Sequence, residues 1–152
     1  MPEIRKIRRS DEAAVKALIH GVLENEFPGD SRAYSYEDLD DLVDHYDGKG
    51  EVFFVAEKDG RLVGTVGIKR DGPETAMLRR IFVEKRHRGK GYGEKLLDAA
   101  IRFCTEQKYD RITFRGTNRM QTAIQLCTKK GFETDGISEL GDLDLVILSK
   151  KL

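Results

Sequence analysis

The chain has 152 residues, the size of one domain that can fold without disulfides or metal. Charged residues make up 36% of it, but the 27 Lys and Arg are balanced by 27 Asp and Glu. A net charge of zero excludes a protein that is basic overall for binding nucleic acid, and it excludes an acidic disordered tail. We therefore expect a single domain over residues 1–152.

The sequence gives no sign of a membrane, secretory or metal-binding protein. No apolar run approaches the roughly 20 residues that span a bilayer, and the first nine residues lack the apolar core of a secretory signal. Cys104 and Cys127 form no CxxC pair, and the three histidines show no metal-ligand spacing. We expect a cytoplasmic protein with no metal, no disulfide and no membrane attachment.

The first part of the chain predicts a strand and two helices. Residues 3–8 alternate between apolar and charged side chains, which predicts a short edge strand. Ser10 and the acids after it predict a helix that continues, at helical apolar spacing, to about Glu26. Ser35, with Asp38 three residues later, predicts the start of the second helix.

The middle of the chain predicts three strands. Runs over 51–58 and 61–69 are rich in β-branched and aromatic residues, and Asp59-Gly60 between them is a hairpin signal. Two glycines inside the second run predict a bulge or a close backbone approach. Residues 74–84 predict the next strand.

The last third predicts two more helices, each followed by strand. The predicted elements are an amphipathic helix over 94–104, a strand over 111–114, and a helix whose apolar positions span 120–127 and which Gly131 caps. Strands over 132–134 and 143–148 follow. The order β-α-α-β-β-β-α-β-α-β-β predicts a mixed α/β fold.

One segment between a strand and a helix carries the pattern of a ligand site: Arg86-His87-Arg88-Gly89-Lys90-Gly91-Tyr92-Gly93. Its alternating glycines leave the backbone open and permit positive φ. Backbone N–H groups at the helix start, together with the helix dipole, would suit a diphosphate. Residues 79–95 hold seven Lys or Arg and two acids, a net charge of +5. The alternative interpretation is a flexible basic surface turn.

Residues 86–91 match Q/R-x-x-G-x-G/A, the acetyl-CoA signature of the GCN5-related N-acetyltransferases (GNAT), which the sequence resembles. Residues 123–127, followed by Gly131-Phe132, resemble a second block of that family, A-I-x-L-Y … G-F. The resemblance implies a GNAT-type mixed, mostly antiparallel sheet with helices on both faces. It also implies an acyltransferase that moves the acetyl group of acetyl-CoA to a small-molecule or peptide amine by direct attack in a ternary complex.

The resemblance further implies which residues contact acetyl-CoA. The pantetheine arm would pair with the strand that contains Ile81, Phe82 and Val83. Asn118 is placed to meet the arm, although it lies further from Ala123 than in the common N-x-x-A. The pyrophosphate would lie against the signature turn, whose implied residues are Arg86, Arg88, Gly89, Lys90, Gly91, Tyr92 and Gly93.

Two positions depart from the family pattern. The Tyr that often acts as general acid falls on Cys127, which either donates a proton to the leaving thiolate or packs as a small buried residue. The usual Glu base falls on Met77. Glu74, three residues earlier, could act through a water or could be a solvated carboxylate. Glu26 and Asp30 are rival candidates.

The acceptor side is less defined. Residues 24–47 hold nine acids and one base, a net charge of −8, which could attract a cationic amine or form the solvated face of a helix. Because the usual Tyr and Glu are missing, a non-catalytic acyl-CoA sensor is an alternative function. A nucleic-acid-binding module built on residues 79–95 ranks last, and we expect no nucleic-acid partner. The sequence leaves open whether the protein forms a homodimer.

Overall fold

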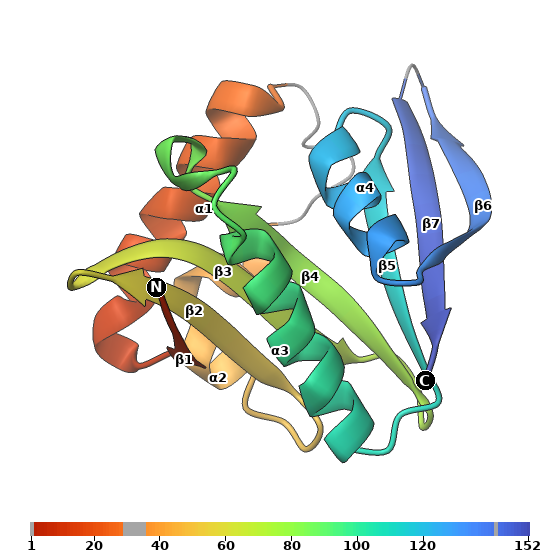
Figure 1. The fold of residues 1–152 in the computed structure, drawn as a ribbon, viewed down its shortest axis with the longest axis horizontal. Helices are drawn as coiled ribbons and strands as arrows, with labels where there is room; N and C mark the ends of the chain where they lie inside the picture. The colour runs from red at the N-terminus through yellow and green to blue at the C-terminus, as the bar shows by residue number, and fades with distance from the viewer. Residues whose placement is uncertain (1, 29–35, 142) are drawn as a thin grey trace.

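The computed structural model describes residues 2–28, 36–141 and 143–152, and within them the chain forms one seven-stranded sheet (Figure 1). The strand order is β1-β2-β3-β4-β5-β7-β6. β4 and β5 run parallel, and the other neighbouring strands of this sheet are antiparallel. The strands are β1 (Glu3–Lys6), β2 (Val52–Lys58), β3 (Arg61–Arg70), β4 (Thr75–Val83), β5 (Arg111–Thr117), β6 (Glu133–Leu140) and β7 (Leu143–Lys151).

The helices and strands follow one another in the predicted order, which confirms the mixed α/β class and the mostly antiparallel sheet. No helix in the described ranges has both the length and the apolar character needed to cross a bilayer. The α-helices are α1 (Glu12–Glu26), α2 (Leu42–His45), α3 (Tyr92–Glu106) and α4 (Gln121–Lys129), and the short 3₁₀ turns are η1 (Arg9–Asp11), η3 (Glu37–Asp40) and η4 (Lys85–His87).

The sheet separates two apolar cores, so helices cover both of its faces. One core packs α3 against the sheet, and the other packs α1. Val52 and Ala56 of β2 belong to the α3 core, whereas Phe53 and Val55 belong to the α1 core. Because successive strand residues point to opposite faces, a strand covered on both sides is apolar nearly throughout. This explains the unbroken apolar run of β2.

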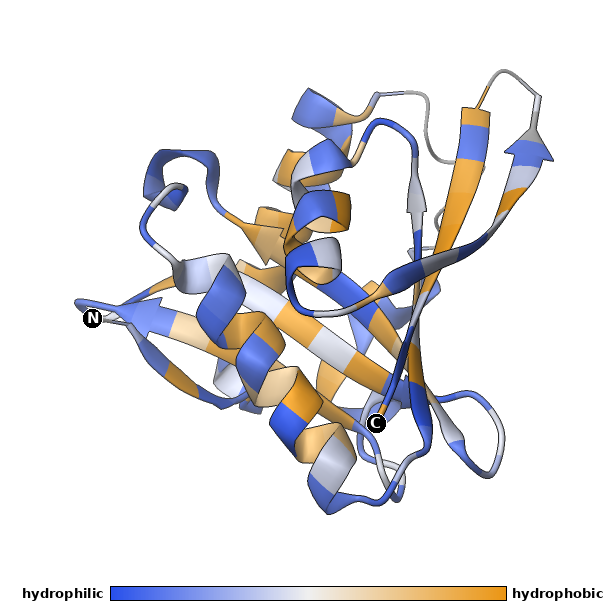
Figure 2. Ribbon diagram, turned by 45° about the vertical axis from the view of Figure 1, so that its right-hand side comes forward, coloured by the Kyte–Doolittle hydropathy of each residue, from blue (hydrophilic) through white to orange (hydrophobic). Residues whose placement is uncertain are grey.

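The helix α3 follows its sequence pattern closely. Figure 2 shows apolar and polar positions alternating along it, and Leu96, Leu97, Ala100 and Cys104 are its fully buried stripe. Burial of a leucine side chain contributes roughly 1.5–3 kcal/mol to folding. Gly91, with a φ of 82°, immediately precedes the first helical turn.

The second predicted helix is broken up in the structure. Ser35, its predicted start, lies outside the described residues. The segment that follows forms the 3₁₀ turn η3 and the single helical turn α2. Asp38 was predicted to help cap this helix, but its carboxylate points inward to Arg80. The segment forms two short elements separated at Asp41, so the prediction of one continuous helix was wrong.

β4 and β5 pair over only part of their length. The ladder runs from Thr75–Arg111 to Leu78–Phe114 and then ends, and the strands diverge beyond it (Figure 1). Arg80 has a φ of 55°, which non-glycine residues rarely adopt, and the register between β3 and β4 shifts at the same place. A bulge of this kind re-aims the end of a strand.

Candidate active site

A cleft of about 410 Å³ lies beside the divergence of β4 and β5. It is lined by the end of α1, the end of β4, the first turn of α3 and the start of α4. The cleft therefore joins the glycine-rich turn to the helix of the second family-like block, two segments that are separate in the sequence. Its volume falls within the range of small-molecule sites.

The glycines of the turn serve two purposes. Gly89 and Gly91 have φ values of 77° and 82°, in the left-handed region that favours glycine. Gly93 has an ordinary φ, but a Cβ there would lie 3.2 Å from Leu126 Cδ2 and 3.6 Å from Val83 Cγ2. The first two glycines shape the turn, and the third lets α3 approach α4 and β4. All three line the cleft.

The first turn of α3 presents backbone donors to the cleft. In the described part of the chain no side chain caps this helix at Gly91. The first N–H groups of an α-helix have no partner within the helix, and the helix dipole adds partial positive charge there. Because Gly91, Tyr92 and Gly93 line the cleft, the donors face a space that suits a phosphate group.

Only some of the basic side chains of the turn line the cleft. Arg88 and His87 line the cleft. Arg86 and Lys90, which were predicted to contact the cofactor, are exposed and lie outside the lining. Positive charge from the turn therefore reaches the cleft through Arg88 and the backbone of α3.

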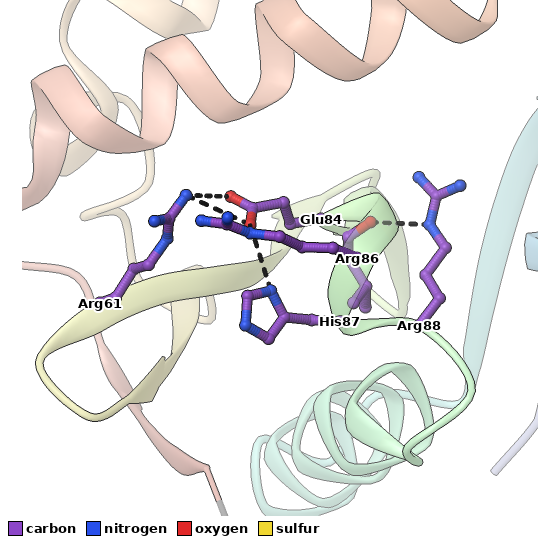
Figure 3. Close-up of polar contacts among 6 residues, drawn as sticks. Arg61, Glu84, Arg86, His87 and Arg88 are labelled. Carbon is purple, nitrogen blue, oxygen red and sulfur yellow. Dashed lines mark hydrogen bonds and ion pairs between the residues drawn. The ribbon is translucent and has the colours of Figure 1, made fainter.

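Glu84 organises the entrance to the turn (Figure 3). Its carboxylate accepts hydrogen bonds from Arg61 at 3.1 Å and Arg86 at 2.7 Å, and it lies 3.1 Å from Nδ1 of His87. Burial alone would raise the pKa of Glu84, but the hydrogen bonds from Arg86 and Arg61 hold that pKa below its ordinary value. The Arg88 guanidinium points away from this cluster in Figure 3.

Arg88 connects the turn to α1. Its Nε donates to the carbonyl of Val83 at 2.8 Å. Its two terminal nitrogens donate to the carboxylate of Glu26 at 2.5 and 2.8 Å. Such bidentate pairs are stronger and more directional than a single hydrogen bond. Glu26, one of the candidate bases, lines the cleft but is engaged by this guanidinium.

In the described part of the chain, the end of β4 has no partner strand on its β5 side. Ile81, Phe82 and Val83 line the cleft. Phe82 and Val83 pair with Thr65 and Gly64 of β3 on one side, whereas the ladder to β5 on the other side has already ended. Backbone groups along such an edge can pair with an extended ligand.

Cys127 lies in the core instead of the cleft. Its side chain is fully buried and does not belong to the cleft lining. Burial raises the pKa of the Cys127 thiol to about 12. A buried thiol with a raised pKa is poorly suited to donate a proton across the cleft. Of the two interpretations open at the sequence level, the structure favours packing.

The structure does not bring Glu74, another candidate base, to the cleft. Glu74 is exposed and precedes the first residue of β4. At ~3.3 Å per strand residue, roughly 20 Å of β4 separates it from Ile81, too far for one bridging water. This position does not support Glu74 as a general base. Asp30 lies outside the described residues.

Asn118 lies in the turn between β5 and α4, where it contacts the start of β7. It is exposed, and its Oδ1 accepts from the N–H of Asp144 at 3.4 Å while its own N–H donates to the carbonyl of Asp144 at 2.8 Å. It is not part of the cleft lining, to which Met120 and Gln121 contribute instead. The contact predicted for Asn118 gains no support from this geometry.

A second cavity, of about 280 Å³, meets the cleft at the divergence of the strands. The two share Ile81, Phe82 and Met120. Arg79 and Arg80, which belong to the same basic stretch of sequence as the glycine-rich turn, line this second cavity and not the cleft. The +5 segment over residues 79–95 is therefore divided between two places in the fold.

A buried ion pair holds the bulge of β4, and sequence reasoning missed it. Arg80 donates to the Asp38 carboxylate at 3.1 and 2.6 Å, and Tyr46 donates to it at 2.7 Å. The carbonyl of Arg80 accepts from the Thr65 hydroxyl at 2.7 Å. The pair of arginines inside a strand with apolar neighbours was the available signal. Its buried partner could not be read from spacing, because Asp38 lies 42 residues away.

Four of the nine acids in residues 24–47 form ion pairs with Lys or Arg side chains that the structure describes. Asp40 pairs with Lys16 and Asp44 with Arg9, and both carboxylates are exposed. Asp38 and Glu26 pair with arginines. This favours a solvated, ion-paired face over an acidic docking site. Within the described residues, no cluster of His, Cys, Asp and Glu could hold a metal ion.

Comparison with known proteins places this geometry in a family. Residues 17–132 match the family described as "Acetyltransferase (GNAT) family". A Xenopus tropicalis protein named "Probable N-acetyltransferase camello" is 29% identical over 124 residues, which are 80% of this chain and 57% of that protein. The chain spans about half the length of the first curated relatives it matches.

Solved structures share the fold over nearly the whole chain. A GNAT-family acetyltransferase from Staphylococcus aureus superposes with a TM-score of 0.85 at 25% identity and covers 99% of each chain. A Salmonella typhimurium protein solved with its cofactor acetyl-CoA gives a TM-score of 0.81 at 21% identity, over 99% of this chain and 94% of that one. The match over residues 17–132 and this common fold show that the chain belongs to the GNAT acetyltransferase family.

Proposed function

We propose that this chain, as a single domain over residues 1–152, transfers the acetyl group of acetyl-CoA to an amine. The observation that carries the proposal is the cleft between the uncapped N-terminus of α3 and the free edge of β4. The first feature suits a diphosphate and the second suits an extended amide-bearing arm. Family membership supplies the reaction class.

Each part of the cleft would have its own role. The backbone N–H groups of Gly91, Tyr92 and Gly93 would hold the diphosphate. The edge of Ile81–Val83 would align the pantetheine arm, so that the thioester lies where the cleft meets the second cavity. The amine would approach through the second cavity and attack the thioester carbonyl directly. Holding both reactants at this junction supplies proximity, the main contribution to the rate that we propose.

The proton of the amine would leave without a dedicated carboxylate. Glu26 is engaged by Arg88, Glu74 is distant, and the second cavity contains no acid among its described lining residues. Proton transfer to water is then the route that the described residues support, and a backbone N–H of β4 would polarise the carbonyl.

Replacing Gly91 tests the cofactor site. Gly91→Asp puts a carboxylate on the turn that is proposed to hold a diphosphate, so it should abolish the thermal stabilisation by acetyl-CoA, which acts by binding the folded state. Gly60→Asp is the matched control, because Gly60 has a φ of 77° and equally open surroundings but lies in the β2–β3 hairpin. A stabilisation in Gly91→Asp equal to that of wild type would refute the site.

A second candidate function is a non-catalytic acyl-CoA sensor. The observation that favours it is the absence of a general acid and base at the usual positions, where this chain has Cys127 in the core and Met77. A panel of amino acids, polyamines, aminoglycosides and peptides, assayed for CoA release, separates the two. Amine-dependent release that disappears in Gly91→Asp supports the transferase, and acetyl-CoA binding without release supports the sensor.

A further inference from the structure

We infer that the acceptor amine carries a carboxylate, which Arg79 and Arg115 bind in the second cavity. This inference rests on the proposed function and names its substrate class: amino acids and other amines with a nearby carboxylate. It reverses the expectation of a cationic acceptor that the acidic segment suggested.

The two arginines come from neighbouring strands at the point of divergence. The last paired residues of the β4–β5 ladder are Leu78 and Phe114, and an arginine follows each of them. Leu78 and Phe114 belong to the α3 core. Because side chains alternate along a strand, Arg79 and Arg115 point to the opposite face, and both line the second cavity.

Among the described residues, the lining of this cavity carries positive charge only. The described lining contains Arg79, Arg80 and Arg115 and no carboxylate. Asp38, behind the lining, is held by Arg80 at 2.6 Å and lies 4.0 Å from Arg79. Asp38 is therefore shared by two guanidinium groups, and Arg115 on β5 brings a third to the cavity. A bound carboxylate would offset this excess of positive charge.

The cavity is also in the right place for an acceptor. It shares Ile81, Phe82 and Met120 with the cofactor cleft. Arg79 precedes Ile81 by two residues, roughly 7 Å at ~3.3 Å per strand residue. A carboxylate held at the arginines thus leaves the amine of a small amino acid close to the junction with the cleft. The guanidinium fork matches the geometry of a carboxylate.

The first measurement compares each amino acid with its carboxamide in the CoA-release assay. The amide keeps the amine and the size but removes the charge. A charge-assisted hydrogen bond contributes about 1.5–3 kcal/mol, so kcat/KM should favour the acid by roughly 10- to 100-fold. In an assay at neutral pH, amidation leaves more of the amine unprotonated, which by itself favours the amide, so a preference for the acid does not arise from the amine. Equal or better turnover of amides overturns the inference and leaves the transferase intact.

Substitutions test whether the two arginines cause the preference for the acid over the amide. The double variant Arg79→Gln with Arg115→Gln should bring the acid-to-amide ratio close to one, mainly through KM. The matched control is Arg111→Gln, since Arg111 lies four residues before Arg115 on β5 and is outside the cavity. Arg111→Gln should keep the ratio of wild type. An unchanged ratio in the double variant would refute the assignment.

A binding measurement keeps the inference testable if no amine is turned over. N-acetyl amino acids should raise the Tm of the CoA-saturated protein, and their amides should not. The double variant should lose the shift. Failure of turnover with this shift present refutes the proposed transfer but supports the carboxylate site. Absence of any difference between acid and amide, with CoA bound, refutes the carboxylate site.

Discussion

At the scale of single residues, Cys127 shows how burial decides a chemical role. Its thiol is enclosed by the α3 core, and its pKa is raised to about 12 by that burial. Cys127→Ala should therefore keep turnover within about twofold of wild type, whereas loss of a general acid typically costs 10²–10⁴-fold. The free energy of unfolding should fall by about 1 kcal/mol through lost packing. Steady-state kinetics and urea denaturation measure the two effects.

Cys104→Ala is the matched control for this prediction. Cys104 is also fully buried and has its pKa raised to about 12 by burial, but it lies on α3 away from the cleft lining. The two variants should behave alike. If folded Cys127→Ala turned over roughly two orders of magnitude more slowly than wild type, with Cys104→Ala unaffected, the thiol would have to take part in the reaction.

At the scale of elements, the bulge of β4 is the feature on which the site depends. Burial would raise the pKa of Asp38, but hydrogen bonds and charge from Arg80 outweigh it, and the pKa lies below its ordinary value. Asp38→Asn leaves the buried Arg80 without a counter-charge, which should cost about 3–5 kcal/mol of unfolding free energy. Urea denaturation at neutral pH measures the loss.

The same pair predicts a pH dependence. A carboxyl with a lowered pKa in the folded state stabilises the protein above its unfolded pKa of ~3.9, and that stabilisation is lost as pH falls through the lower folded pKa. Unfolding free energy of wild type should fall more steeply below about pH 4 than that of Asp38→Asn. Asp40→Asn, which breaks an exposed pair with Lys16, should leave the free energy of unfolding nearly unchanged, because exposed ion pairs are weak. Parallel pH profiles for wild type and Asp38→Asn would contradict the assignment.

Elements with local signals were predictable from the sequence, and those that depend on distant partners were not. The amphipathic stripe of α3 and the hairpin at Asp59-Gly60, where both residues have positive φ, are specified by neighbours in the chain. The break between η3 and α2 and the bulge at Arg80 depend on an ion pair across 42 residues. No periodicity records such a pair.

The candidate site also has parts that local sequence predicts and parts that depend on distant packing. The glycine-rich turn was predictable because the left-handed φ of Gly89 and Gly91 and the start of α3 are local properties. The positions of Asn118 and Glu74 outside the cleft depend on how β4, β5 and β7 come together. Net charge over a window was the weakest guide, since it joined arginines that the fold places on different cavities.

At the scale of the whole molecule, the pair between Glu26 and Arg88 connects the helix layer on one face to the turn before α3 on the other. Both side chains line the cleft and are only partly exposed, at 23% and 33%. A bound diphosphate would compete with the Glu26 carboxylate for the guanidinium and would also be repelled by that carboxylate. The pair should therefore lower the affinity for acetyl-CoA while it stabilises the empty protein.

Glu26→Gln should accordingly bind acetyl-CoA more tightly. Removing the carboxylate frees Arg88 for the diphosphate and removes a repulsion, and a gain of ~1 kcal/mol corresponds to a Kd lower by roughly fivefold. Titration calorimetry measures the change. Glu24→Gln, two residues earlier on α1 at an exposed pair with His20, should leave the Kd unchanged. The gain in Glu26→Gln should shrink as salt rises, because attraction to a partly exposed guanidinium is screened over ~8 Å at physiological ionic strength. Weaker binding in Glu26→Gln would show instead that Glu26 orients Arg88 for the cofactor.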